Sequence, residues 1–446
     1  MERLEQDGRR GARLMLIWGI LLSVCLVILA GIPIAGGLAL VAVGTMLITA
    51  GPDLLVIFVQ RTYAATTSFP LLAIPFFILA GNLMNVGGTT ERIFGVANLL
   101  VGKIRGGLAQ VNVLGSMIFA GMSGSAVADA AGLGTIEIRA MVKEGYTPRY
   151  SATISAVSAT IGPIIPPSIP FVIFGSLANV SVGALFLAGV VPGLLMGLGL
   201  MVAIAIVSVQ RNLPRSAGWP GLAQALRIFK QAAPALALPP AILAVIFTGV
   251  ATPTEAAVIA AALAFVLGRF FYRELRMRDF WDTLWETGRQ TAQVMLIIAM
   301  AAPFSWVLIQ QQVPNAILKA LLALSTEPWI ILLLVNVVLL ILGMFLEAIA
   351  IMIIAYPILA PVMAAIGVDP VHFGVIMVLN LMIGLVTPPV GLCLYVVSGI
   401  AKVPIADVVR ELAPYLLALL VVLAIVTYVP AVSTWLPHVF GLGVVR

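Results

Sequence analysis

Hydroxyl groups and glycine occur together in the stretch Gly-Met-Ser-Gly-Ser-Ala-Val-Ala-Asp at residues 121–129, inside an apolar region. Hydroxyls and unpaired backbone carbonyls suit a hard cation such as sodium, so Ser123, Gly124 and Ser125 are predicted to bind sodium. The helix that follows points free N–H groups and its positive dipole end at an anion, and Ser125 and Asp129 are therefore also predicted at a carboxylate site. Two simpler roles stay open: the serines only cap this helix, and Asp129 is a first-turn acid favoured by the dipole.

Proline pairs interrupt two further apolar stretches, Gly162–Ser168 and Gly384–Gly391. Adjacent prolines remove backbone donors and leave upstream carbonyls without helical partners, which hydrocarbon cannot satisfy. Corresponding breaks in two halves of a chain indicate the binding site of a transporter. The residues predicted to bind sodium are Gly162, Pro166, Thr387, Pro388 and Gly391, and those predicted to contact substrate are Pro167, Ser168 and Pro389.

Two polar side chains lie in other apolar regions. Glu347 follows Gly343 in the second half, and an ionisable residue inside a membrane is a functional candidate. Glu347 is therefore predicted at the sodium site, with a structural carboxylate bonded to backbone donors as the alternative. Because no arginine or lysine occupies the middle of an apolar span, an anion must be held by helix ends, hydroxyls, bound cations and amides such as Asn380.

The two breaks belong to a longer repeat, since the proline pairs begin at positions 166 and 388, a spacing of 222. The same spacing relates Gly121 to Gly343, Gly145 to Gly367, Pro148 to Pro370, Gly162 to Gly384, and Pro192 to Pro414. Coincident glycines and prolines report coincident backbone geometry. Residues 14–218 and 234–436 are therefore predicted to be structural repeats.

Composition places the chain in a membrane. Of its 446 residues 62% are hydrophobic and 9% are charged, whereas soluble domains carry about 25% charged residues. Its two cysteines, Cys25 and Cys393, lie in apolar segments and are expected to be small core residues. There is no Walker, zinc or CxxC motif and no basic patch interleaved with aromatics, which argues against ATP hydrolysis, metalloenzyme chemistry and nucleic-acid binding.

At about 20 apolar residues per span, membrane helices are predicted near 14–31, 33–50, 70–87, 151–178, 183–209, 234–250, 254–270, 290–311, 371–399 and 411–436. Of these, 151–178 and 371–399 contain the proline pairs and are predicted as broken helices. Residues 108–146 and 329–367 each hold two apolar arms around a glycine-containing centre, which predicts re-entrant hairpins. An arm such as Leu108–Phe119 spans roughly 18 Å, about half of the hydrocarbon core.

Charges that flank the hairpins predict opposite orientations. They are Lys103, Arg105, Arg139, Lys143 and Arg149 around the first hairpin, and Glu327, Asp369 and His372 with a single Lys319 around the second. By the positive-inside rule the first hairpin enters from the cytoplasm and the second from the other side. The repeats are therefore predicted to be inverted.

Segments outside the repeats have simpler roles. Residues 219–233 are predicted as an amphipathic connector, residues 271–289 as an interfacial helix, and residues 437–446 as a tail. The polar segment 1–13 conflicts with the topology above, which places its arginines outside.

Thr252-Pro-Thr-Glu255 predicts a helix capping box. His372 and His438 lie near span ends, where an interfacial or loop role is expected over a proton relay.

Together the motifs resemble the large membrane subunit of tripartite ATP-independent periplasmic (TRAP) transporters, over about residues 14–436. The motifs that carry the resemblance are 121–129, 162–170, 252–257, 387–391, and 69–77 followed by Gly81. The resemblance implies an all-α polytopic membrane protein with inverted repeats, two re-entrant hairpins and two broken helices, working as an elevator-type importer in a bacterial inner membrane. It implies that hairpin tips and breaks hold sodium, the coupling ion and only cofactor, and an organic acid such as a C4-dicarboxylate or sialic acid. It also implies a small four-helix membrane subunit and a periplasmic substrate-binding protein as partners.

Three other classes of protein share some of these features. A stand-alone sodium/dicarboxylate symporter would have the same hairpins without needing a binding protein. A channel tolerates half-helices but does not couple ion to solute. An intramembrane enzyme is disfavoured, because no pair of catalytic residues is predicted at a common site.

Overall fold

The computed structural model describes residues 15–442 except 17, 21, 25, 28, 29 and 216–220, and it describes the backbone but not the side chains of residues 50 and 121–123. The polar segment 1–13 and Cys25 therefore lie outside the described residues, as do the first two residues of the connector and the last four of the tail. The first predicted span, 14–31, is only partly described.

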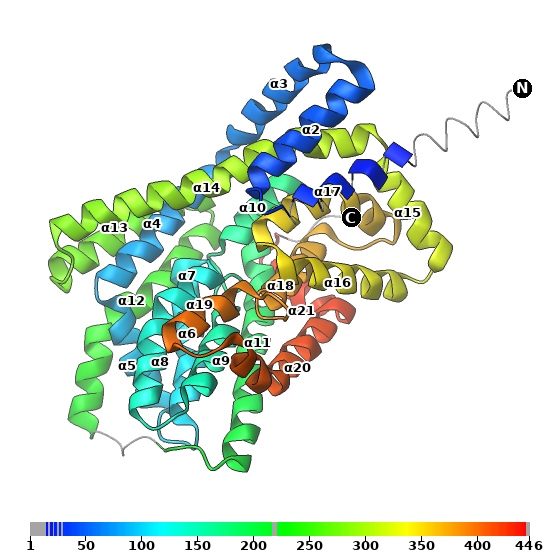
Figure 1. Cartoon of the computed structure of the whole chain (residues 1–446). Helices are drawn as coiled ribbons and strands as arrows, with labels where there is room; N and C mark the ends of the chain where they lie inside the picture. Colours follow the sequence, from blue (N-terminus) through cyan, green and yellow to red (C-terminus); the bar gives the residue numbers. More distant parts are fainter. Residues whose placement is uncertain are drawn as a thin grey trace, which may run out of the picture. The chain divides into compact units, whose positions relative to one another are not determined.

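The described residues are helical, and none of them belongs to a named strand (Figure 1). In chain order the helices are α2 (Ile34–Ala50), η1 (Pro52–Leu54), α3 (Leu55–Thr66), η2 (Phe69–Leu72), α4 (Ala73–Val86), α5 (Thr89–Val101), α6 (Gly107–Ser123), α7 (Ala126–Ala131), α8 (Leu133–Lys143), α9 (Pro148–Ala159), α10 (Ile169–Ala178), α11 (Val182–Gln210), α12 (Leu222–Phe247), α13 (Pro253–Val266), η3 (Leu267–Phe271), α14 (Met277–Gln310), α15 (Val313–Leu324), α16 (Pro328–Phe345), α17 (Ala348–Ala365), α18 (Pro370–Gly384), α19 (Leu392–Ala401), α20 (Ile405–Tyr428) and α21 (Ala431–Val439).

Eight described helices are long and apolar enough to cross a membrane. They are Phe69–Val86, Val182–Gln210, Leu222–Phe247, Pro253–Phe271, Met277–Gln310, Pro328–Phe345, Ala348–Ala365 and Ile405–Tyr428. The predicted spans 70–87, 183–209 and 254–270 agree with three of these to within a residue. The polytopic, all-α class predicted from composition is confirmed.

Two predicted amphipathic segments are parts of longer helices. The described part of the connector 219–233 runs into the following span as α12, with Pro234, Pro239 and Pro240 inside one helix. The interfacial segment 271–289 likewise continues into the span after it as the 34-residue α14. The predicted boundaries lie at the change from amphipathic to apolar composition, and that change does not interrupt helical hydrogen bonding.

Both hairpins consist of two arms around a short non-helical centre. In the first, α6 ends at Ser123, and the second arm is divided into α7 and α8 at Gly132. In the second, α16 and α17 have 18 residues each. These arms are longer than the half-membrane length expected, because helix formation continues up to the glycine-containing centre.

Both predicted broken helices are broken where the proline pairs lie. α9 ends at Ala159 and α10 begins at Ile169, while α18 ends at Gly384 and α19 begins at Leu392. The Pro166-Pro167 and Pro388-Pro389 peptide bonds are both cis.

The chain divides into two compact units, each built from segments of both predicted repeats. Unit 1 contains residues 1–68, 291–331 and 349–370, and in it α2 packs against α3. Unit 2 contains residues 69–290, 332–348 and 371–446. Since this division follows packing rather than sequence similarity, the repeat boundaries remain a prediction.

Unit 2 holds both breaks and the first hairpin. Helix α9 packs against α6, α8, α19 and α20, and α7 packs against α19, so helices from both repeats meet there (Figure 1). On another side α4 lies along α13. The capping box predicted at Thr252 and Glu255 is present at the start of α13.

Candidate functional site

The tip of the first hairpin packs directly on the first break. Gly124 ends α6 with φ +61°, a conformation that favours glycine. A methyl group at Gly124 would lie 3.1 Å from the backbone nitrogen of Ile169 and 3.4 Å from the carbonyl oxygen of Pro167. Glycine therefore allows the tip to approach the non-helical backbone of the break.

The two serines at this tip are described to different extents. The side chain of Ser123 lies outside the described residues. Ser125 is the N-cap of α7, and its hydroxyl oxygen accepts a hydrogen bond from the N–H of Ala128 at 3.4 Å. Capping is thus observed for Ser125, and it leaves a sodium role open because a hydroxyl oxygen has two lone pairs.

Asp129 lies between the first break and a helix of the second half. Asp129 is 2% exposed, and its Oδ2 lies 2.1 Å from the position that a methyl group on Gly162 would take. Its helix α7 packs against α19, where Cys393 is a buried free thiol as expected. The carboxyl group is therefore enclosed by elements from both halves of the chain.

The end of α16 and the second break repeat this arrangement within unit 2. The N–H of Gly391 donates to the carbonyl oxygen of Met344 at 3.1 Å. A methyl group on Gly384 would lie 2.6 Å from Cα of Gly343. Gly391 has φ +60°. These contacts bring Gly343, Met344, Gly384 and Gly391 together.

The hydroxyls of both breaks bond to nearby backbone. Ser168 is fully buried, donates to the carbonyl oxygen of Pro163 and accepts from the N–H of Phe171 at 3.3 Å, which makes it the N-cap of α10. Thr387 Oγ1 donates to the carbonyl oxygen of Ile383 at 2.7 Å. Each hydroxyl therefore shapes its break, and only its remaining lone-pair capacity is left for a ligand.

Asn380 is buried where α18 contacts α16. It has no exposed surface, and its Nδ2 donates to the backbone oxygen and to Oδ1 of Asn336, at 2.9 and 2.7 Å. Asn336 in turn donates to Thr427 at 3.1 Å. The amide donors of Asn380 thus tie α18 to α16.

Glu347, by contrast, is partly exposed in the two-residue gap between α16 and α17.

A buried polar cluster beside the first hairpin was not found by sequence reasoning. Asn112 Nδ2 donates to Ser155 Oγ at 2.6 Å, Ser158 Oγ donates to Asn112 Oδ1 at 2.5 Å, and Ser155 Oγ donates to Glu137 Oε2 at 3.3 Å. Glu137 is 1% exposed. Glu137 itself was the signal in the sequence that could have revealed this cluster, because an ionisable residue inside a membrane hairpin is costly unless it has a role.

A second missed cluster joins three helices. The carboxylate of Glu411 on α20 forms ion pairs with Arg149 at 3.0 Å and with Arg211, which follows α11. The hydrogen bond to Glu411 is the main reason that the pKa of Arg211 is raised above its usual value.

Of the two histidines expected near span ends, His372 is 2% exposed, and its Nδ1 lies 2.7 Å from Ser433 Oγ.

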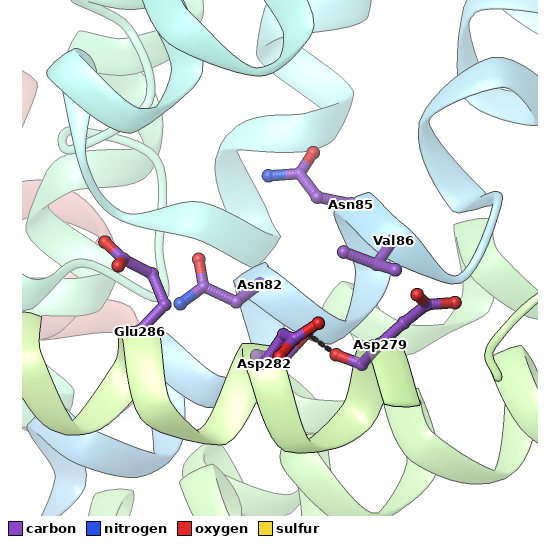
Figure 2. A pocket seen from close by; sticks show the side chains of 7 residues that line it. Asn82, Asn85, Val86, Asp279, Asp282 and Glu286 are labelled. Carbon is purple, nitrogen blue, oxygen red and sulfur yellow. Dashed lines mark hydrogen bonds between the residues drawn. The ribbon is translucent and has the colours of Figure 1, made fainter. Parts of the chain in front are cut away.

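A cavity of about 320 Å³ lies elsewhere in unit 2, between α4 and the start of α14. It is lined by Asn82, Asn85, Val86, Asp279, Asp282, Thr283 and Glu286. Figure 2 shows Asn82 of α4 beside Glu286 and Asp282 of α14, whereas the amide of Asn85 points away from α14. No group of three or more His, Cys, Asp or Glu side chains in the described part of the chain is arranged to hold a metal ion.

Comparison with known proteins identifies the family. Residues 21–432 match the family model of the DctM component of tripartite ATP-independent periplasmic transporters. The sialic acid TRAP transporter large permease protein SiaM of Vibrio cholerae is 41% identical over 414 residues, covering 92% of this chain and 96% of SiaM. The C4-dicarboxylate TRAP transporter large permease protein DctM of Pseudomonas aeruginosa is 44% identical over 383 residues, covering 86% and 90%.

Among solved structures, the YdaH transporter of Alcanivorax borkumensis superposes with a TM-score of 0.65 at 15% identity, covering 89% of this chain and 91% of YdaH. That similarity concerns the fold alone. The chain belongs to the DctM family of large TRAP transporter permeases. It is therefore a transport protein and not an enzyme, and it is a multi-pass protein of the bacterial inner membrane.

Proposed function

We propose that this chain imports an organic acid with sodium, as the translocating subunit of a tripartite transporter. The observation that carries the proposal is the pairing of each non-helical break with glycine-lined backbone: Gly124 with Pro167 in one half, and Gly343 with Gly384 in the other. Both pairs lie in one compact unit. Irregular backbone at membrane depth is stable only where it is enclosed by protein or lines a cavity, and transporters use it to hold ions.

The groups at the proposed site suit a sodium ion. Carbonyl oxygens around the proline pairs and the hydroxyls of Ser125 and Thr387 are oxygen ligands that suit a hard ion. Asp129, enclosed between α7, Gly162 and α19, supplies a carboxylate. Bound sodium would in turn offset the negative charge of an organic acid, which couples the two solutes.

The names of relatives support an organic acid as the substrate. They specify sialic acid, C4-dicarboxylates and isethionate, at nearly equal identity to this chain. The first two are carboxylic acids and the third is a sulfonate, so the shared feature is an organic anion. The N-terminal end of α10, which follows the first break, favours an anion through its partial positive charge.

The proposed partners are a small four-helix membrane subunit and a periplasmic substrate-binding protein. They are expected because the matched family is tripartite. Movement of the site-bearing unit as an elevator would give alternating access without rebuilding the site.

Reconstitution tests the proposal. Proteoliposomes that contain this chain and its membrane partner, supplied with the binding protein, should accumulate a C4-dicarboxylate or sialic acid under an inward sodium gradient. The matched control replaces sodium by potassium and imposes only a proton gradient. Equal uptake in the control would exclude sodium coupling. Uptake by this chain alone would instead identify a stand-alone symporter.

A further inference from the structure

Three arginines lie close together where a loop leads into α14: two in the loop and Arg278 in the first turn of the helix. Arg273, Arg276 and Arg278 are all exposed. Within the described residues, none of their guanidinium groups has a carboxylate partner within 4 Å. Three positive charges thus face outward within six residues.

The loop that carries them is held in place by α5. Glu274 forms an ion pair with Arg92 at 2.7 Å, and the guanidinium of Arg92 lies 4.0 Å from the ring centre of Tyr272. A methyl group at Gly87 would lie 3.1 Å from Cα of Gly268, so the two backbones touch at the base of the loop. Few conformational states are lost when such a loop binds a ligand, which favours binding.

Two tryptophans extend this basic surface along α14. Trp281 and Trp285 are one helical turn apart and are 63% and 81% exposed. Arg278 precedes Trp281 by three residues and so lies on the same face. On the opposite face Thr283 and Thr287 are buried, and Thr287 accepts a hydrogen bond from Asn82 of α4 at 3.1 Å.

The acids of the same helix do not neutralise the arginines. Asp279, Asp282 and Glu286 line the cavity beside α4 (Figure 2), and Glu286 is already paired with Arg289 at 2.8 Å. Asp279 lies in the first turn and accepts a hydrogen bond from the backbone N–H of Arg276 at 3.3 Å, but among the described residues no acid forms an ion pair with the three guanidinium groups. Cations at a helix N-terminus are disfavoured by the helix dipole, so their clustering there calls for an external anion.

Helix length places this surface at the edge of the membrane. α14 contains 34 residues, whereas about 20 suffice to cross the hydrocarbon core. Its first turns therefore extend beyond the hydrocarbon to the headgroup level, where tryptophan is enriched and where basic residues meet anionic lipids.

We propose that Arg273, Arg276 and Arg278 bind the phosphate headgroup of an anionic phospholipid, with Trp281 and Trp285 anchored in the adjoining interface. The planar guanidinium group binds phosphate through two parallel hydrogen bonds. The exposed tryptophans favour a lipid over a soluble anion, because a soluble anion would leave both rings in water.

The test measures lipid retention by the purified full-length chain in nanodiscs. Discs contain phosphatidylcholine alone or with phosphatidylglycerol, and co-purifying lipid is counted by native mass spectrometry. The test variant carries Arg273→Gln, Arg276→Gln and Arg278→Gln. The control variant carries Arg139→Gln, Lys143→Gln and Arg410→Gln, which removes the same charge from exposed positions elsewhere.

The wild type and the control should retain phosphatidylglycerol selectively. The test variant should lose that selectivity by roughly tenfold or more, since each basic residue near an anionic surface contributes a factor of about five. A variant with lysine at the three positions should keep part of the selectivity, because lysine retains the charge but not the two parallel hydrogen bonds of arginine. Such partial retention would show that the loop still folds. Trp281→Ala with Trp285→Ala should weaken retention of both lipids.

Three outcomes would overturn the proposal. The first is undiminished phosphatidylglycerol retention by the glutamine variant. The second is a thermal shift caused by inorganic phosphate in phosphatidylcholine discs that is as large as the shift caused by phosphatidylglycerol. That result would make this a site for a soluble anion. The third is loss of assembly with the co-expressed small membrane subunit while lipid retention is unchanged, which would make it a protein interface.

Discussion

Gly343 at the end of α16 and Gly384 at the end of α18 are in backbone contact: Cα of Gly343 lies 2.6 Å from the position that a methyl group on Gly384 would occupy. These residues are the counterparts of Gly121 and Gly162 at the 222-residue spacing of the two halves. The contact brings the centre of the second hairpin next to the second break, and any side chain at Gly384 must push the two apart.

Gly384→Ala should therefore impair both stability and transport. Overpacking costs about 1–3 kcal/mol, and the separation would open the site that the break contributes to. The measurement is the thermal unfolding midpoint in detergent together with sodium-driven uptake. Gly399→Ala is the matched control, because nothing lies within 4 Å of that position. If both variants behave like the wild type, the contact has no role.

Asp129→Asn should leave the protein folded but raise the sodium concentration needed for half-maximal uptake by about tenfold or more, equivalent to about 1.4 kcal/mol of binding free energy. The reason is that the substitution removes the negative charge and keeps the size of the side chain. Glu91→Gln removes a first-turn acid from α5 and serves as the control. Unchanged sodium dependence together with a lowered midpoint would identify Asp129 as a helix-dipole acid only.

Ser123→Ala and Ser125→Ala should each weaken sodium dependence while the protein still folds, because each change deletes one oxygen without opening a large cavity. Ser125→Ala also removes the cap of α7, at about 1 kcal/mol. Ser181→Ala removes the comparable cap of α11 and is the control. If Ser125→Ala merely reproduces the effect of Ser181→Ala on stability, capping is its whole role.

Glu411→Gln should lower the free energy of unfolding by about 1 kcal/mol. Glu411 is buried, but its partners Arg149 and Arg211 are 52% and 46% exposed, so water screens the pairs and limits their value. Asp407→Asn, which breaks the exposed pair with Arg410, should change stability by less than about 0.5 kcal/mol. If a denaturation series gives both variants the same change in the free energy of unfolding, the burial of Glu411 adds nothing to stability.

The inverted orientation of the hairpins predicts labelling from opposite sides. Single cysteines at Lys143 and Asp369, in a protein without Cys25 and Cys393, should react with an impermeant maleimide from the cytoplasm and the periplasm respectively. Oriented vesicles and whole cells provide the two sides. Reaction of both positions from the same side would contradict inverted repeats.

Much of the fold can be predicted from sequence because prolines and glycines act on their own backbone. The pairs Pro166-Pro167 and Pro388-Pro389 lie where helices are interrupted, and Thr252 with Glu255 caps α13 through contacts three residues apart. The extents of α12 and α14 were underestimated, since α12 continues through Pro234, Pro239 and Pro240, and α14 continues through the change from amphipathic to apolar composition.

Residue types and spacing alone determined that this is a membrane protein with two hairpins and two broken helices, because hydropathy and backbone restrictions are local properties. Tertiary structure alone decided which polar groups meet: Asn380 with Asn336, Glu137 with Ser155, and Glu411 with Arg149 and Arg211. It also decided that Asp129 lies against Gly162. Such pairs depend on how helices distant in the chain pack, and packing is set by the shapes of many side chains at once, which no local pattern records.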